Sequence, residues 1–204
     1  MGLFLSLSGV VGGATVEVVD ALSELSQRHS GYLRPATPSE NEDTRMVIAS
    51  GPSGATVLYP GDFMGWDAAS VFLSVRLAKP TFCFHIHDGD LWMFHLYVNG
   101  TAVTAFCPIP DYWGDVSDEE FVRGDASIVA KYVPNVKAPD IERYFVRWSL
   151  EGSERTKAYP DDEYFIEDDW QLCDFMRKIG FVYPLDGNGS PVGDCFSFRA
   201  AIDN

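Results

Sequence analysis

The chain has 204 residues, with 30 Asp and Glu against 15 Lys and Arg, and its formal net charge at pH 7 is −15. Hydrophobic residues make up 46% of it and aromatic residues 14%, which is too much apolar material for a disordered acidic tail. The negative balance argues against sequence-independent nucleic-acid binding and docking on anionic lipid, because both need clusters of Lys and Arg. We therefore expect a globular protein with neither nucleic acid nor membrane among its partners.

The four cysteines, Cys83, Cys107, Cys173 and Cys195, predict free thiols. No pair has the CxxC spacing of a zinc knuckle, and four cysteines in a chain of this length do not make a disulfide scaffold. Reduced, buried thiols are typical of a protein kept in the cytoplasm, which is the location we expect.

The first part of the chain predicts the element order β-α-β-β-α-β. The expected elements are a strand over 3–8, a helix that is capped by Thr15 and ends at Arg28, His29 and Gly31, strands over 46–50 and 55–59, a helix over 66–78, and a strand over 81–87. In the first helix, Val18, Leu22 and Leu25 recur at helical spacing. This order is the split βαβ, or ferredoxin-like, pattern. We expect an α+β fold with a mostly antiparallel sheet and a ferredoxin-like start.

Two short turn motifs predict a three-stranded meander over 81–107. Asp88-Gly89 and Asn99-Gly100 each lie between β-rich runs, and such pairs favour two-residue hairpin turns in which both central residues have positive φ. Side chains alternate between the faces of a strand, and both faces of this meander are largely apolar. We therefore expect other elements to cover the sheet on both sides, at least in part.

The register of the first hairpin predicts a metal site. With a two-residue turn at 88–89, His87 lies opposite Asp90, and His85 lies on the same face. Two imidazoles and one carboxylate form a two-His-one-carboxylate ligand set for Fe(II), Mn(II) or Zn(II). A divalent metal is thus a candidate cofactor, and a small metal-dependent enzyme is the alternative function. The simpler interpretation is a core His85 and a His87–Asp90 pair that closes the turn.

The second half predicts a helical, acidic region, because residues 103–204 carry a net charge of −10 against −5 for residues 1–102. The expected elements are a capped turn at 117–120, helices over 126–132, 140–148 and 169–179, the last capped by Asp168 or Asp169, and a strand over 196–199. We expect residues 1–204 to form a single domain, with a sheet-rich part over 1–110 and a helical acidic part over 111–204.

Acidic and aromatic residues together predict a partner-binding surface. Six acidic residues fall within the nine residues 161–169, with no basic residue among them. A second acidic segment spans 111–125, and Arg123 is its only basic residue. Such charge steers a basic partner, and aromatic side chains beside charge are typical of interface hot spots. The expected contact residues are Tyr112, Trp113, Asp161, Asp162, Glu163, Glu167 and Asp168. The alternative is a solvated face that keeps the protein soluble.

These patterns favour a non-enzymatic interaction or inhibitor protein of the immunity type, with a basic protein as its partner. The chain has no GxSxG motif and no phosphate-binding glycine motif. The Asp-Gly-Asn-Gly-Ser run at 186–190 begins like a calcium loop. Pro191 stands where such a loop needs glycine, so we expect a surface loop instead.

Overall fold

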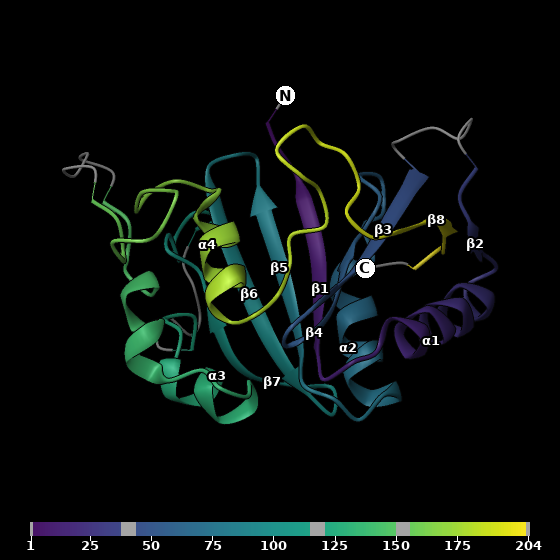
Figure 1. Cartoon of the computed structure of the whole chain (residues 1–204), viewed down its shortest axis with the longest axis horizontal. Coiled ribbons are helices and arrows are strands. Elements are labelled where there is room, and N and C mark those ends of the chain that lie inside the picture. Colours follow the sequence, from purple (N-terminus) through teal and green to yellow (C-terminus); the bar gives the residue numbers. More distant parts are fainter. Residues whose placement is uncertain (1, 38–43, 115–120, 150–155, 203–204) are drawn as a thin grey trace.

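The computed structural model describes residues 2–37, 44–114, 121–149 and 156–202, which form an α+β fold (Figure 1). Its strands are β1 (Leu5–Val11), β2 (Tyr32–Pro35), β3 (Arg45–Gly51), β4 (Gly54–Leu58), β5 (Thr81–His87), β6 (Leu91–Val98), β7 (Thr101–Phe106) and β8 (Asp194–Arg199). Its α-helices are α1 (Thr15–Arg28), α2 (Trp66–Arg76), α3 (Ala126–Tyr132) and α4 (Gln171–Lys178). The strands form one eight-stranded sheet in the order β2-β8-β3-β4-β1-β5-β6-β7, and every neighbouring pair is antiparallel.

The elements expected in the first part of the chain are present, with shifts at their ends. Helix α1 lies in the connection from β1 to β3, and β4 lies between these two strands in the sheet. Helix α2 connects β4 to β5, and β1 lies between them. The first strand begins later than expected and runs on to Val11. Ala14 rather than Thr15 precedes the first helical residue, and its amide donates to the carboxylate of Glu17 at 3.0 Å. The short strand β2 was not predicted.

Apolar cores lie on both faces of the sheet, as expected. Helices α1 and α2 cover one face, where Leu22 and Leu73 are buried together with Val57 of β4. The second half of the chain covers the other face (Figure 1), where aromatic rings dominate. There the Phe175 ring of α4 packs with its centroid 5.4 Å from that of Trp92. The expectation that the meander is covered on both sides is confirmed.

The meander is present, and its second hairpin has the expected two-residue turn. Val98 pairs with Thr101, and Asn99 and Gly100 have φ values of 49° and 80°. A bulge follows between Leu96 and Tyr97 and ends this register. The prediction from the Asn-Gly pair is therefore confirmed for the turn itself.

The register expected for the first hairpin is wrong by one residue. Asp88 and Gly89 have the positive φ values that the turn requires, and the Asp90 amide donates to the carbonyl oxygen of His87 at 2.9 Å. The ladder, however, pairs His87 with Leu91, so Asp90 stays in the loop. His85 consequently pairs with Met93. The loop is also held from outside the hairpin, because the Gly89 amide donates to the carbonyl oxygen of Leu3 at 2.9 Å.

The second half contains less helix than expected. The helix over 126–132 is confirmed as α3, and the Asp125 carboxylate caps it by accepting from the Ser127 and Ile128 amides. The helix expected over 140–148 is wrong, because only two single 3-10 turns, Ala138–Asp140 and Glu142–Tyr144, form there. The turn expected at 117–120 lies outside the described residues.

Tertiary hydrogen bonds explain the missing helix. The Tyr159 hydroxyl accepts from the Arg143 amide at 3.2 Å and donates to the Pro139 carbonyl at 2.8 Å. The Trp148 amide donates to the carbonyl oxygen of Pro108 at 3.0 Å. Because these backbone groups bond to other parts of the chain, the segment satisfies them without helical bonds.

The last helix and strand are confirmed with small shifts. Helix α4 begins at Gln171, two residues after the expected start, and the Asp168 carboxylate accepts from the Trp170 amide at 2.9 Å. Strand β8 forms where a strand was expected and pairs with both β2 and β3. All four cysteines are described and are free thiols. Within the described ranges, no helix is both long and apolar enough to cross a membrane.

Candidate functional site

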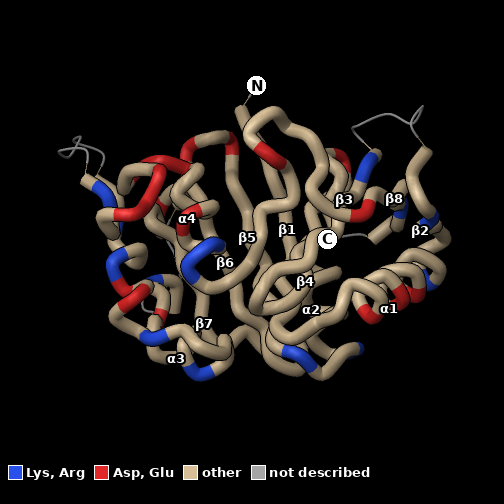
Figure 2. Tube along the Cα trace, viewed as in Figure 1, with Lys and Arg blue, Asp and Glu red and all other residues tan. Residues whose placement is uncertain are grey.

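The acidic segment 161–169 lies beside α4, where Figure 2 shows several acidic residues close together. Asp162 is only 3% exposed, and its carboxylate accepts from the Tyr144 hydroxyl at 2.6 Å and from the Tyr159 amide at 2.8 Å. A carboxylate satisfied in this way holds the segment in place. The structure therefore puts Asp162 inside the protein, and not on the surface to which the sequence assigned it.

The other predicted acids differ in what they contact. Asp161 is exposed and accepts from Lys178 at 2.7 Å, and this hydrogen bond is the main cause that lowers the pKa of Asp161 to about 2. Glu167 accepts from the Ser149 amide at 3.0 Å, and Asp168 bonds the residue before α4. Glu163 is exposed. Much of the acidic run is thus bound within the protein, and Glu163 lies at the surface beside a pocket.

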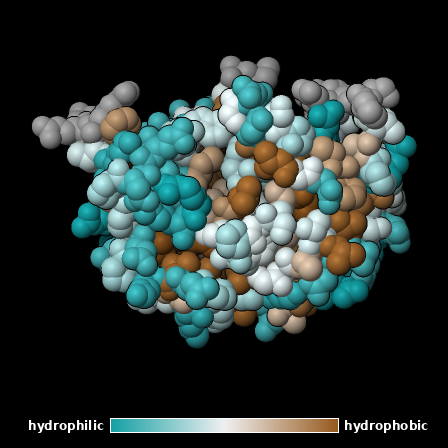
Figure 3. Space-filling model, in the orientation of Figure 1, coloured by the Kyte–Doolittle hydropathy of each residue, from teal (hydrophilic) through white to brown (hydrophobic). Residues whose placement is uncertain are grey.

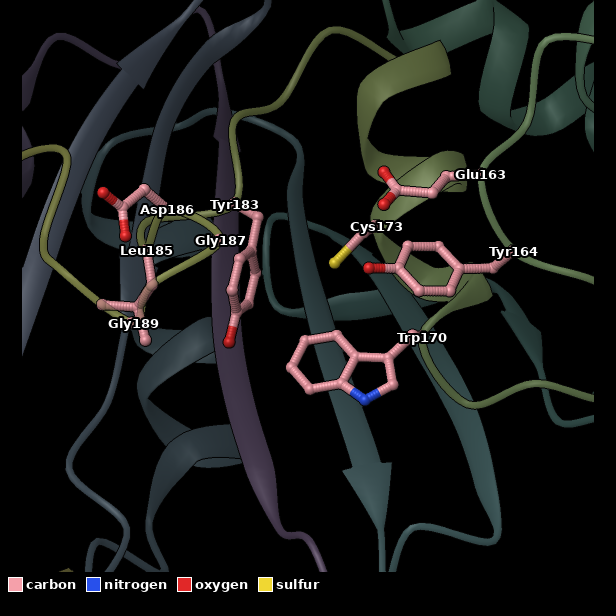
Figure 4. Close-up of a pocket in the computed structure, with 9 residues that line it drawn as sticks. All are labelled: Glu163, Tyr164, Trp170, Cys173, Tyr183, Leu185, Asp186, Gly187 and Gly189. Atoms are coloured by element: carbon pink, nitrogen blue, oxygen red, sulfur yellow. The ribbon is translucent and has the colours of Figure 1, made fainter.

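This pocket has a volume of about 460 Å³ and opens between the segment that precedes α4 and the loop that follows α4 (Figure 4). We call it the aromatic pocket. Its lining residues are Glu163, Tyr164, Trp170, Cys173, Tyr183, Leu185, Asp186, Gly187 and Gly189. Figure 3 shows hydrophobic surface in the middle of this face, with strongly hydrophilic surface beside it at the left.

Three aromatic rings form the walls of the aromatic pocket. The Trp170 and Tyr164 rings are 6.4 Å apart between centroids and inclined by 27°. Tyr183 stands almost perpendicular to Trp170, at 87°, with the centroids 5.7 Å apart. The carboxylates of Glu163 and Asp186 lie on opposite sides of the rings (Figure 4). The pocket therefore combines apolar walls with negative charge at its edges.

The Cys173 thiol, inside the pocket, reports its electrostatic environment. Burial is the main cause that raises the pKa of Cys173 to about 12, and the neighbouring carboxylates, with Asp174 and Glu163 foremost, add to it. The thiol therefore stays protonated at neutral pH and is a poor nucleophile. Burial disfavours a charge of either sign, whereas the carboxylates that add to the shift also attract a positively charged ligand.

Sequence reasoning missed three residues of this site. Asp174 is 2% exposed and accepts from the Glu163 and Tyr164 amides, which orients two of the pocket's side chains. Asp186 accepts from the Asn188 and Ser190 amides and shapes the expected surface loop. The third is Tyr183. Asp186 begins the Asp-Gly-Asn-Gly-Ser run, but Asp174 and Tyr183 belong to no local motif. No pattern in the sequence therefore connects these three residues.

Tyr112 and Trp113 lie at the end of the first hairpin rather than among the lining residues of the aromatic pocket. The Tyr112 hydroxyl donates to the Asp90 carboxylate at 2.5 Å. The Trp113 ring is 56% exposed and lies 4.9 Å from the ring of His87 between centroids. The structure therefore divides the predicted partner-binding residues between two places.

The predicted metal ligands are brought together only in part. Nε2 of His85 lies 3.4 Å from Nδ1 of His87, and Nδ1 of His85 lies 2.9 Å from the Ser6 hydroxyl. Asp90 is bound to Tyr112 instead, as a consequence of the shifted register. In the part of the chain that the structure describes, no three His, Cys, Asp or Glu side chains are grouped so as to hold a metal ion.

The two histidines line a second pocket of about 430 Å³, on the face of the sheet that α2 covers. The His85 ring stacks on Trp66, with the centroids 4.4 Å apart and the planes inclined by 7°. Burial, followed by the neighbouring His87, lowers the pKa of His85 to about 4. His85 is therefore neutral at physiological pH. Met93 and Phe4 also line this pocket.

Comparisons of the chain with protein-family models, with curated proteins and with solved structures give no match in any of the three.

Proposed function

We propose that this protein is a non-enzymatic binding protein, of the inhibitor or immunity type, that captures a basic protein through the surface around the aromatic pocket. The observation that carries this proposal is the combination of three aromatic walls with the carboxylates of Glu163 and Asp186. Aromatic side chains supply contact area in interfaces, and complementary charge accelerates association. The net charge of −15 supports attraction of a basic partner over a distance.

The buried carboxylates support the same function. Asp162 and Asp174 fix the backbone of the segment before α4, so that Glu163 and Tyr164 are held in place before a partner arrives. Preorganisation of this kind reduces the conformational entropy lost on binding.

Selection from a random peptide library tests the proposal. We expect peptides recovered on the immobilised protein to be enriched in Lys and Arg over the starting library, with recovery falling as salt is added. Glu163→Gln should weaken binding of the selected peptides by about threefold, as the loss of one exposed charge pair predicts. Asp20→Asn, which removes one exposed carboxylate from α1, is the matched control. Recovery without basic enrichment, or recovery unaffected by salt, would contradict the proposal.

We further propose that the first part of the chain is a split βαβ, ferredoxin-like unit and that the protein is cytoplasmic. The order β3-β4-β1-β5, with α1 and α2 on one face, supports a split βαβ, ferredoxin-like unit, to which the acidic second half adds the binding surface. The free state of all four cysteines supports a cytoplasmic location.

A metal-dependent enzyme is the second candidate, favoured by the 3.4 Å contact between Nε2 of His85 and Nδ1 of His87. The Ser6 hydroxyl on the other nitrogen of His85 resembles the outer partner that orients a metal-binding imidazole. On this proposal, untagged protein supplemented with Zn²⁺ should retain about one equivalent of metal after dialysis, and His87→Gln should retain none. Metal content far below stoichiometric after supplementation with zinc, manganese and iron would exclude this candidate.

A further inference from the structure

We propose that the aromatic pocket binds a compact alkylammonium group, namely the side-chain ammonium of a lysine or of an N-methylated lysine on the partner, in preference to an arginine guanidinium. This inference rests on the proposed function, because it names the chemical group through which the partner engages this surface. The main observation behind it is that the rings of Tyr164, Trp170 and Tyr183 surround one opening.

The geometry of the rings selects the shape of the cation. A cation is attracted to the face of an aromatic ring, most strongly to that of tryptophan, and cages of several rings recognise quaternary ammonium groups. Tyr183 and Trp170 meet at 87° and form a corner, while Tyr164 lies more nearly parallel to Trp170. A compact ammonium group contacts both walls of such a corner. A planar guanidinium instead stacks along one ring and is oriented by bidentate partners.

The charges around the rings select the sign of the ligand. The carboxylates of Glu163 and Asp186 flank the opening from two sides (Figure 4). No Lys or Arg is among the described residues that line the pocket, so nothing there compensates a phosphate or a carboxylate. The carboxylates of Asp174 and Glu163 also act on the Cys173 thiol, where they add to the larger effect of burial in raising its pKa.

Four small probes test the proposal on the full chain. They are Nα-acetyl-lysine methylamide, its Nε-trimethyl form, the corresponding arginine derivative, and a neutral analogue in which carbon replaces the trimethylated nitrogen. Binding is followed by NMR through the backbone amide shifts of Gly187 and Gly189, which line the pocket. We expect the trimethyl form to bind most tightly, and the neutral analogue about tenfold more weakly, which is the ratio that a desolvated cation–aromatic contact supplies. The arginine derivative should bind more weakly than either lysine form.

Variants locate the binding. Trp170→Ala should weaken binding of the trimethyl probe by about tenfold or more, whereas Tyr183→Phe, which keeps the ring, should bind it nearly as well as the unmodified protein. Trp113→Ala is the matched control, because it removes an exposed tryptophan that does not line the aromatic pocket. Tyr164→Leu removes a different aromatic wall of the pocket and, unlike Trp170→Ala, does not change the residue that precedes α4.

Equal binding of the neutral analogue, tighter binding of arginine, or full binding to both Trp170→Ala and Tyr164→Leu would each overturn the ammonium site. The two proposals fail separately. If basic peptides are selected but their binding ignores Trp170, the basic partner stands and the ammonium pocket does not. If the lysine probes bind as expected while no basic peptide is enriched, the pocket stands and the basic-protein function does not.

Discussion

An Asp174→Ala variant is expected to have a free energy of unfolding about 3 kcal/mol lower than that of the unmodified protein. The buried carboxylate accepts from the Glu163 amide at 3.0 and 2.9 Å, from the Tyr164 amide at 2.7 Å and from the Arg177 guanidinium at 2.9 Å. Alanine leaves both amides without this acceptor, and unsatisfied buried donors are costly. The midpoint of urea unfolding at neutral pH measures the loss.

Two further substitutions make this prediction specific. Asp161→Ala also removes an acid from the neighbourhood of Arg177, but that carboxylate is exposed, so its midpoint should remain close to that of the unmodified protein. Asp174→Asn keeps one acceptor oxygen, so its midpoint should fall between those of Asp174→Ala and Asp161→Ala. A midpoint for Asp174→Ala as high as that for Asp161→Ala would show that the buried carboxylate does not hold the segment. Loss of Asp174 should also weaken peptide binding, because Glu163 and Tyr164 lose their common anchor.

Acidification from pH 7 to pH 5 is expected to lower the free energy of unfolding by about 2 kcal/mol through His85 alone. The pKa of this imidazole is 6.5 when unperturbed and about 4 in the folded protein, chiefly because of burial. Between these values the unfolded chain binds a proton that the folded chain does not, so protons favour unfolding. The stabilisation is complete above the unfolded pKa and declines as the pH falls toward 4.

His85→Gln isolates this contribution from that of the carboxylates, which titrate in the same range. Urea unfolding at a series of pH values should show a shallower decline between pH 6.5 and pH 5 for this variant than for the unmodified protein. Identical slopes for the unmodified protein and His85→Gln would contradict the burial of a neutral imidazole.

Local patterns in the sequence predicted most of the sheet and its helices, because periodicity and turn residues act over short distances. The Asp-Gly pair correctly predicted positive φ at Asp88 and Gly89. It did not predict that Asp90 stays in the loop, since the contacts that hold this loop come from Leu3 and Tyr112. The proposed ligand trio depended on that single residue of register.

The aromatic pocket was less predictable than the fold. The sequence indicated Glu163 of this site through the local run of acids. Tyr183 and Asp186 belong to the same site only because the chain turns back after α4, where Gly180 takes a φ of 79°. The buried roles of Asp162 and Asp174 were hidden for a related reason. Helical spacing joins Asp174 to Arg177, but no spacing rule identifies the backbone amides and the tyrosine that these two carboxylates also accept from.

The placement of β8 between β2 and β3 has a consequence for the nascent chain. Residues 52–193 separate β3 from β8 along the sequence, so a ribosome must synthesise this whole stretch before β3 gains its second neighbour. Contacts between such distant segments form slowly, because a long loop must close first. Until then β3 presents an unpaired, apolar edge that another unfinished chain can extend. Premature termination before Asp194 would make that exposure permanent and the product prone to aggregation.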